Sequence, residues 1–249
     1  MKYLEVIMSR VLKSEVIVYP DSDGERMSDN TEQFDWIVVV KLNLEWLFAS
    51  DPNVFIAGDL LWYPVEGDNK TRIAPDTMVI FGRPKGRRGS YQQWNEGNIA
   101  PQVVFEVLSP GNRAKEMKKK LDFYAQYAVE EYYIIDPDRK KLKGYLRKSN
   151  KLEPIFQMDT WVSPKLKIKF TLQQGEIQLY YPDGKPFLNY VELAQRLEQE
   201  SLLVEQERER ASQERERANQ EQEKANQERE RANKLAEKLR AIGIDPDRF

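Results

Sequence analysis

The stretch PQVVFEVLSPGNRAKEMKKKLDFYAQYAVEEYYIIDPD, residues 101–138, decides the fold class. Residues 102–108 form an apolar run that predicts a buried strand. The turn signal Ser109-Pro110-Gly111-Asn112 follows and leads into a helix expected over 113–128. Residues 131–136 predict the next strand, because they are β-branched and aromatic and are followed by a proline. A strand, a helix and a further strand in this order indicate an α/β domain.

The segments on either side of this stretch complete a mixed sheet. Asn30 is a helix N-cap signal, and the apolar pattern after it predicts a helix over 31–49. Residues 82–100 form a long loop rich in glycine and arginine. Strands are expected over 16–19, 54–56, 59–63, 77–81, 142–146, 152–157, 166–171 and 176–181. The order of helices and strands predicts an α+β mixed sheet with helical cover.

The pattern changes near residue 190 to a charged repeat. Residues 206–233 are four heptads, QERERAS, QERERAN, QEQEKAN and QERERAN. One small apolar residue per heptad makes a weak coiled-coil seam, whereas Glu-to-Arg pairs three residues apart support a solvated helix. A weak coiled coil and a lone charged helix both remain open. The expected division is a domain over 1–192, a charged helix over 193–242 and a short tail over 243–249.

Composition limits the chemistry that this chain can perform. Its 249 residues contain no cysteine and no histidine, which excludes thiol nucleophiles, zinc–thiolate sites and a histidine base. Carboxylates remain, and their oxygens suit Mg²⁺, Mn²⁺ or Ca²⁺. The net charge of −2 does not indicate nucleic-acid binding over the whole surface. No apolar run reaches the roughly 20 residues of a membrane span, and no signal-peptide pattern is present, so a cytoplasmic location is expected.

Two acidic residues stand beside predicted buried strands. Asp76 directly precedes the strand 77–81, and Glu106 lies inside the strand 102–108. Each has an ordinary explanation, a turn carboxylate for Asp76 and an ion pair at an exposed strand end for Glu106. Together they could meet at one sheet edge, where a metal ion would neutralise both. Lys120 on the following helix could face inward toward them, or it could instead pair with Glu116.

At this point the residues resemble a known family. Pro75-Asp76 followed by Glu106 in a buried strand resembles the PD-(D/E)XK nuclease signature, and 101–138 is similar to the Uma2-type restriction endonuclease family. The resemblance covers about residues 20–190. It implies a restriction-endonuclease-like core followed by the charged helix, and hydrolysis of phosphodiester bonds that depends on Mg²⁺ or Mn²⁺.

The resemblance assigns roles residue by residue. Asp76 and Glu106 match the two acidic positions and would be catalytic metal ligands. Leu108 stands where the signature has lysine, and Lys120 occupies the helix position to which the family's lysine is taken to have moved. Glu116 stands where many members carry aspartate and would support the site.

Further contributors are expected from other segments. Asp59 could add a metal ligand, with strand-start solvation as the alternative, and Glu32 could assist, with helix capping as the alternative. A DNA contact could come from the loop 82–100, whose alternative role is that of a solvated loop. The four cations proposed for it are Arg83, Lys85, Arg87 and Arg88.

Three functions compete at this stage. The first is a metal-dependent DNA endonuclease that cuts phosphodiester bonds. The second is a catalytically silent nucleic-acid-binding domain that keeps the fold, motivated by Leu108. The third is a coiled-coil assembly protein, in which residues 195–240 bind a second copy or a helical partner.

Overall fold

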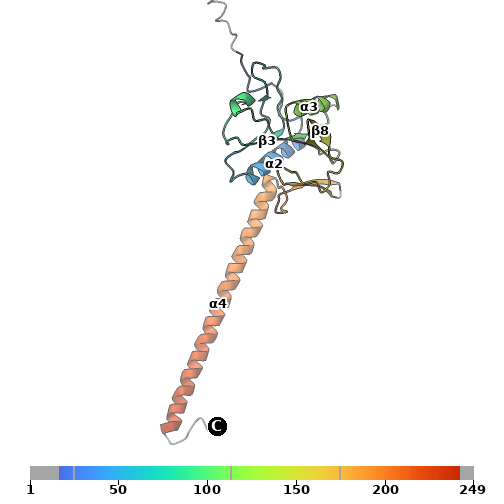
Figure 1. The fold of residues 1–249 in the computed structure, drawn as a ribbon. Helices are drawn as coiled ribbons and strands as arrows, with labels where there is room; N and C mark the ends of the chain where they lie inside the picture. The colour runs from blue at the N-terminus through green and yellow to red at the C-terminus, as the bar shows by residue number, and fades with distance from the viewer. Residues whose placement is uncertain (1–16, 25, 113, 174, 242–249) are drawn as a thin grey trace, which may run out of the picture. The chain divides into compact units, whose positions relative to one another are not determined.

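The computed structural model describes residues 17–24, 26–112, 114–173 and 175–241, and the chain divides into two compact units, Met1–Asn189 and Tyr190–Phe249. The first unit is a mixed α/β domain, and the second is a long helix (Figure 1). The elements in chain order are α2 (Thr31–Leu47), β1 (Val54–Ala57), β2 (Trp62–Tyr63), β3 (Thr77–Phe81), β4 (Tyr91–Gln92), the 3₁₀ helix η1 (Gln93–Glu96), β5 (Val103–Val107), α3 (Ala114–Gln126), β6 (Glu131–Asp136), β7 (Lys141–Lys148), β8 (Lys151–Pro154), β9 (Lys169–Gln173), β10 (Glu176–Tyr180) and α4 (Tyr190–Ala241).

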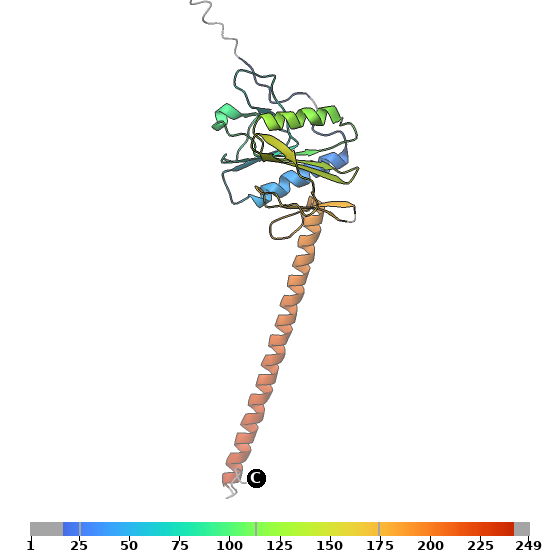
Figure 2. The same ribbon diagram turned by 45° about the vertical axis from the view of Figure 1, so that its right-hand side comes forward.

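The central sheet has the strand order β1-β3-β5-β6-β7-β8. Only β5 and β6 pair in parallel, and the other neighbours in this sheet are antiparallel. A parallel pair needs a crossover connection, which α3 supplies. Figure 2 shows α3 on one face of the sheet, with α2 and the β9–β10 hairpin on the other.

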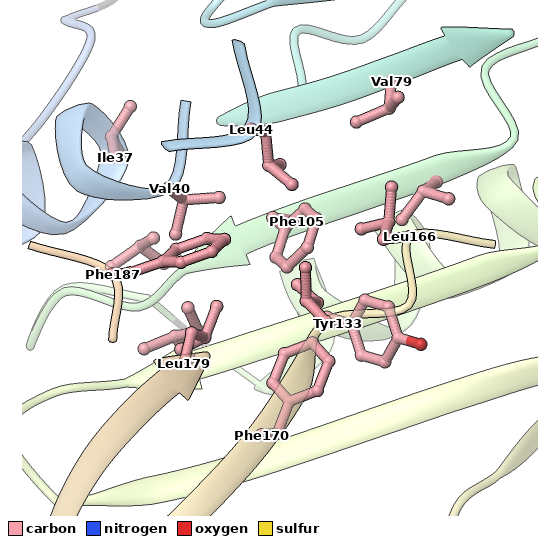
Figure 3. Packing of buried hydrophobic residues seen from close by; sticks show 14 of the residues in the cluster. Ile37, Val40, Leu44, Val79, Phe105, Tyr133, Leu166, Phe170, Leu179 and Phe187 are labelled. Carbon is pink, nitrogen blue, oxygen red and sulfur yellow. The ribbon is translucent and has the colours of Figure 1, made fainter. Parts of the chain in front are cut away.

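The two faces of the sheet bury two separate apolar clusters. On the α2 face, Phe105, Tyr133 and Phe170 pack ring against ring beneath Val40 and Leu44 (Figure 3). The cluster on the α3 face contains other residues of the same strands. Successive side chains of a strand point to opposite faces. An even-numbered residue of β5 therefore lies under α3.

Most of the expected elements are present, with shifts of a few residues at their ends. The strands expected over 77–81 and 131–136 have those bounds in β3 and β6. The strand expected over 59–63 is wrong for its first part, because Asp59 adopts a left-handed φ of 48° and only Trp62–Tyr63 pairs as a strand. The strand expected over 16–19 is also wrong for residues 17–19, which form no strand, and Val16 lies outside the described residues.

Helix α4 contains the charged heptads, and its described side chains are exposed except at Ala236, which is partly buried. The ion pairs Arg196–Glu200 and Glu230–Lys234 each join residues four apart in this helix. These contacts within one helix do not distinguish a coiled coil from a lone charged helix. Across the described residues, no helix is both long and apolar enough to cross a membrane.

Candidate active site

The strand register brings Asp76 and Glu106 together. In the antiparallel pair β3–β5, Thr77 lies opposite Phe105. One step further along, Asp76 comes opposite Glu106. Asp76 is two residues from Met78, and Glu106 is two residues from Val104. Met78 and Val104 belong to the α3-face cluster, and side chains two residues apart along a strand share a face, so both carboxylates lie on that face of the sheet. The sequence places each carboxylate beside a strand, and the register makes them a pair.

Helix α3 holds the carboxylate of Glu106 at both oxygens. The Lys120 Nζ atom donates to Glu106 Oε2 at 2.6 Å, and the Tyr124 hydroxyl donates to Glu106 Oε1. Glu106 is only 2% exposed, and the Lys120 side chain is 19% exposed. Burial disfavours the charged lysine, but the carboxylates of Glu106 and Asp76 outweigh it and raise the pKa of Lys120. Lys120 therefore faces inward as a cation.

Asp76 is the second buried carboxylate and is 9% exposed. Its Oδ2 atom accepts the backbone N–H of Val107 at 2.6 Å. Burial, and then the nearby charge of Glu106, raise the pKa of Asp76 well above its ordinary value. Within the described part of the chain, Asp76 Oδ1 has no hydrogen-bond donor. Two carboxyl groups therefore share one lysine, and a cation bound beside them would favour the ionised form of Asp76.

Gln33 of α2 also reaches the end of β5. Its Nε2 atom donates to the Val107 carbonyl at 2.8 Å, and its Oε1 atom accepts the N–H of Asp29. Glu32, the neighbour proposed from the sequence, is exposed in the first turn of α2. The Asn30-x-x-Gln33 spacing is a capping-box signal that could have indicated Gln33. It could not have indicated the contact with Val107, which lies 74 residues away.

The turn after β5 is fixed by polar contacts. The Ser109 hydroxyl donates to the Asp29 carboxylate, and the Ser109 N–H donates to Asn112 Oδ1 at 2.7 Å. The Asn112 Nδ2 atom donates to Glu116 Oε1 at 3.3 Å. Glu116 is exposed and lies one helical turn before Lys120. Leu108 packs against the α3-face cluster. The position that carries lysine in the nuclease signature is apolar here, and the cation comes from α3.

Asp59 lies near the carboxylate pair but is exposed. Its N–H donates to the Pro75 carbonyl at 3.1 Å, which ties it to the residue before Asp76. The pKa of Asp59 is raised by loss of solvent around part of the residue and then by the negative charge of Asp23. The positive charge of Lys120 lowers this pKa, and the negative charge of Glu106 raises it by a smaller amount. Asp23 is an acidic neighbour that the sequence did not indicate.

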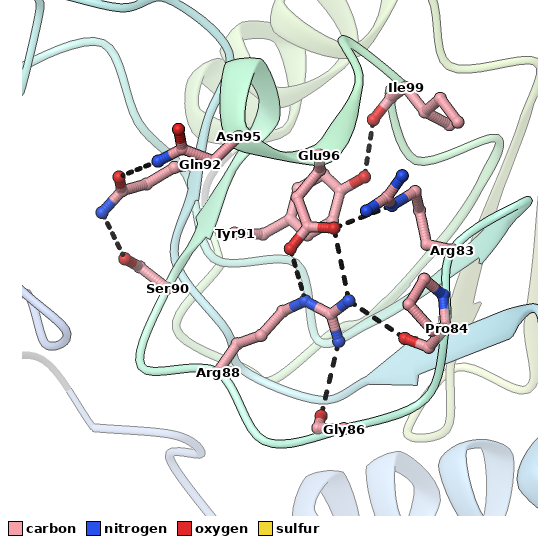
Figure 4. Close-up of polar contacts among 10 residues, drawn as sticks. All are labelled: Arg83, Pro84, Gly86, Arg88, Ser90, Tyr91, Gln92, Asn95, Glu96 and Ile99. Atoms are coloured by element: carbon pink, nitrogen blue, oxygen red, sulfur yellow. Dashed lines mark hydrogen bonds and ion pairs between the residues drawn. The ribbon is translucent and has the colours of Figure 1, made fainter.

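Two of the four proposed DNA-binding cations are held by one carboxylate. Arg83 Nε and Arg88 Nε lie 2.8 Å and 2.6 Å from the two oxygens of Glu96 (Figure 4). Lys85 Nζ donates to two backbone carbonyls just after α2, at 2.6 and 3.0 Å. Arg87 is exposed. The loop is therefore internally crosslinked, and three of its four cations have partners within the domain.

The donor set fits a hard divalent cation. Among residues 17–24, 26–112, 114–173 and 175–241, no three acidic side chains form a metal-binding group. Mg²⁺, however, commonly uses one or two carboxylates and keeps several water molecules. Each carboxylate oxygen has two lone pairs, so the contacts of Glu106 Oε2 and Asp76 Oδ2 leave acceptor capacity. The carboxylates of Asp76 and Glu106 therefore match the number of protein ligands that Mg²⁺ commonly uses.

Comparisons with known proteins identify the family of this chain. The family described as "Uma2: Putative restriction endonuclease" matches residues 27–186. Among solved structures, the chain is similar to a crystal structure of "a putative nuclease belonging to DUF820 from Anabaena variabilis ATCC 29413", with 16% identity and a TM-score of 0.41 over 54% of this chain and 72% of that chain. No curated protein matches. Because the family match spans more than half of the sequence, the chain belongs to the Uma2 family.

Proposed function

We propose that this chain is a metal-dependent endonuclease that hydrolyses phosphodiester bonds in DNA. The observation that carries the proposal is the position of Asp76, one residue before β3 and next to the β3–β5 register, beside Glu106, whose carboxylate lies 2.6 Å from Lys120 Nζ. Membership of the Uma2 family supports the reaction class. The absence of histidine and cysteine is compatible with it, because metal-assisted hydrolysis needs neither residue.

Asp76 and Glu106 would hold one or two Mg²⁺ or Mn²⁺ ions, and Asp59 would add a ligand from the exposed side. A bound metal would lower the pKa of a coordinated water and offset charge on the scissile phosphate. Lys120 keeps the Glu106 carboxylate oriented and places a positive charge beside the pair. The same charge would stabilise the negative charge that develops on the phosphate during hydrolysis.

DNA is the proposed substrate and partner. Arg87 is the exposed cation of the 82–100 loop and would contact a backbone phosphate. Arg83 and Arg88 would act indirectly, since their ion pairs with Glu96 shape the loop that presents Arg87.

The test is cleavage of supercoiled plasmid DNA by the purified chain in Mg²⁺ or Mn²⁺, compared with an Asp76→Ala/Glu106→Ala variant. We expect cutting that EDTA abolishes and that the double variant lacks. Glu131→Gln is the matched control, because Glu131 is an equally buried carboxylate at the other end of the β5–β6 pair. Cutting that persists in a clean double variant would refute the site.

Two other outcomes would support the competing functions. A wild type that binds DNA without cutting it would favour the silent binding domain. Deleting residues 195–249 and measuring the mass by sedimentation addresses assembly through α4. An unchanged oligomeric mass after this deletion would count against a coiled coil.

A further inference from the structure

Glu106 receives two hydrogen bonds from α3, and the two donors differ in environment. Lys120 and Tyr124 are four residues apart, so one helical turn presents both to the same carboxylate. The Lys120 side chain keeps some contact with solvent, whereas Tyr124 is fully buried. The lysine supplies a charged donor at Oε2, and the tyrosine supplies a neutral donor at Oε1.

Packing fixes the position of the Tyr124 hydroxyl. The Tyr124 ring meets the ring of Tyr132 edge to face at 4.9 Å and the ring of Phe123 at 6.0 Å. Rings held on two sides in a close-packed cluster have few alternative rotamers. The hydroxyl is therefore a rigid point to which Glu106 Oε1 is tied.

Tyr132 provides an internal comparison. It is as buried as Tyr124, belongs to the same cluster and lies on β6, the strand next to β5. Its hydroxyl has no hydrogen-bond partner within the described residues, however. The two tyrosines thus differ mainly in whether the hydroxyl contacts Glu106.

We propose that Tyr124 is a positioning residue for the metal-binding carboxylate of Glu106. It holds Oε1 toward the interior, so that Oε2 stays on the side of Lys120 and Asp76. This inference rests on the proposed function, because it assigns Tyr124 to the metal site of that nuclease. Residues that hydrogen-bond a metal ligand commonly change metal affinity or activity 10- to 100-fold when they are removed.

The experiment compares Tyr124→Phe with Tyr132→Phe, since each change removes one buried hydroxyl and keeps the ring. Mn²⁺ binding is measured by titration calorimetry without DNA, and turnover of plasmid DNA is measured at saturating Mn²⁺. We expect Tyr124→Phe to weaken Mn²⁺ binding about 10-fold or more and to lower kcat. Tyr132→Phe should match the wild type in both measurements. A purely structural role for Tyr124 would lower thermal stability without changing the Mn²⁺ affinity of the folded protein.

A second measurement does not depend on the folding of a variant. In wild type labelled with ¹³C-tyrosine, Mg²⁺ should shift the ring resonances of Tyr124 more than those of Tyr132. Equal shifts, wild-type Mn²⁺ affinity in Tyr124→Phe, or equal losses in both variants would overturn the proposal. If the wild type binds Mn²⁺ but cuts no DNA, the proposed nuclease activity is refuted, and the Mn²⁺ affinity of Tyr124→Phe alone decides the role of Tyr124. Wild type that binds no Mn²⁺ would refute both.

Discussion

Two lysines of α3 form ion pairs with similar N–O distances and different burial. Lys120 Nζ lies 2.6 Å from Glu106, and Lys118 Nζ lies 2.5 Å from Asp122. The side chains of the first pair are 19% and 2% exposed, and those of the second are 66% and 62% exposed. Changing each lysine to methionine removes the ammonium group and keeps most of the apolar stem. The comparison therefore contrasts a buried ion pair with an exposed one in their effect on the free energy of unfolding.

The magnitudes follow from the environment of each carboxylate. Removing one partner of a buried pair costs about 3–5 kcal/mol, because a buried charge is left uncompensated. Glu106 would keep its hydrogen bond from Tyr124, and the lysine position is partly open to water. We therefore expect Lys120→Met to cost about 2–3 kcal/mol, below the range for a fully buried pair. Lys118→Met should cost about 0.5 kcal/mol or less, as exposed pairs do.

Urea unfolding followed by tryptophan fluorescence measures these differences. All five tryptophans lie within residues 1–189, so the signal reports the α/β domain. The double variant Glu106→Gln/Lys120→Met should be more stable than Lys120→Met alone, because it removes the uncompensated charge. Equal costs for the two lysine variants would refute the reasoning, and so would a double variant that recovers no stability.

Three other predictions concern separate parts of the domain. Burial raises the pKa of Glu131, so the folded state binds this proton more tightly than the unfolded chain. The free energy of unfolding of the wild type should therefore fall, relative to Glu131→Gln, as the pH rises from the unfolded pKa of about 4.3 through the higher folded pKa. Urea titrations at several pH values measure this difference, and parallel pH profiles of the two proteins would contradict the prediction. Gly144→Ala should destabilise the domain by about 1–3 kcal/mol, because a Cβ there would lie 2.5 Å from Met158 Sδ. Adding Met158→Ala to this variant should restore part of the lost stability, measured by thermal unfolding. Arg88→Ala should lower the melting temperature, because Arg88 is paired with a carboxylate, whereas exposed Arg87→Ala should leave it unchanged and weaken DNA binding in a filter assay; DNA affinity that is unaffected by Arg87→Ala would remove this residue from the interface.

The sequence was informative wherever local pattern decides structure. The apolar runs at 77–81 and 131–136 are strands, and the pattern after Asn30 begins a helix. These predictions depend on periodicity and capping, which act within a few residues. The failure at Asp59 has a local cause as well, since a left-handed residue interrupts strand geometry without any sign in the apolar pattern.

Charge partners were less predictable than elements. The arginines of the 82–100 loop suggested a DNA contact, but Glu96 holds both Arg83 and Arg88. Glu96 belongs to the same loop and lies in η1, and its distance from both arginines is set by the folded loop and not by sequence spacing. Counting cations in a loop cannot show which of them are already paired.

The sequence by itself determined that Asp76 directly precedes a buried strand, that Glu106 lies inside another, and that lysine is absent from position 108. Only the tertiary structure decided that β3 and β5 are neighbours in a register that sets the two carboxylates opposite each other. It also decided that Tyr124 donates a hydrogen bond to Glu106 and that Gln33 donates one to Val107, both at the end of β5. The reason is physical: strand pairing and helix packing join residues far apart in the chain, and a buried polar group accepts whichever donor that packing brings within reach.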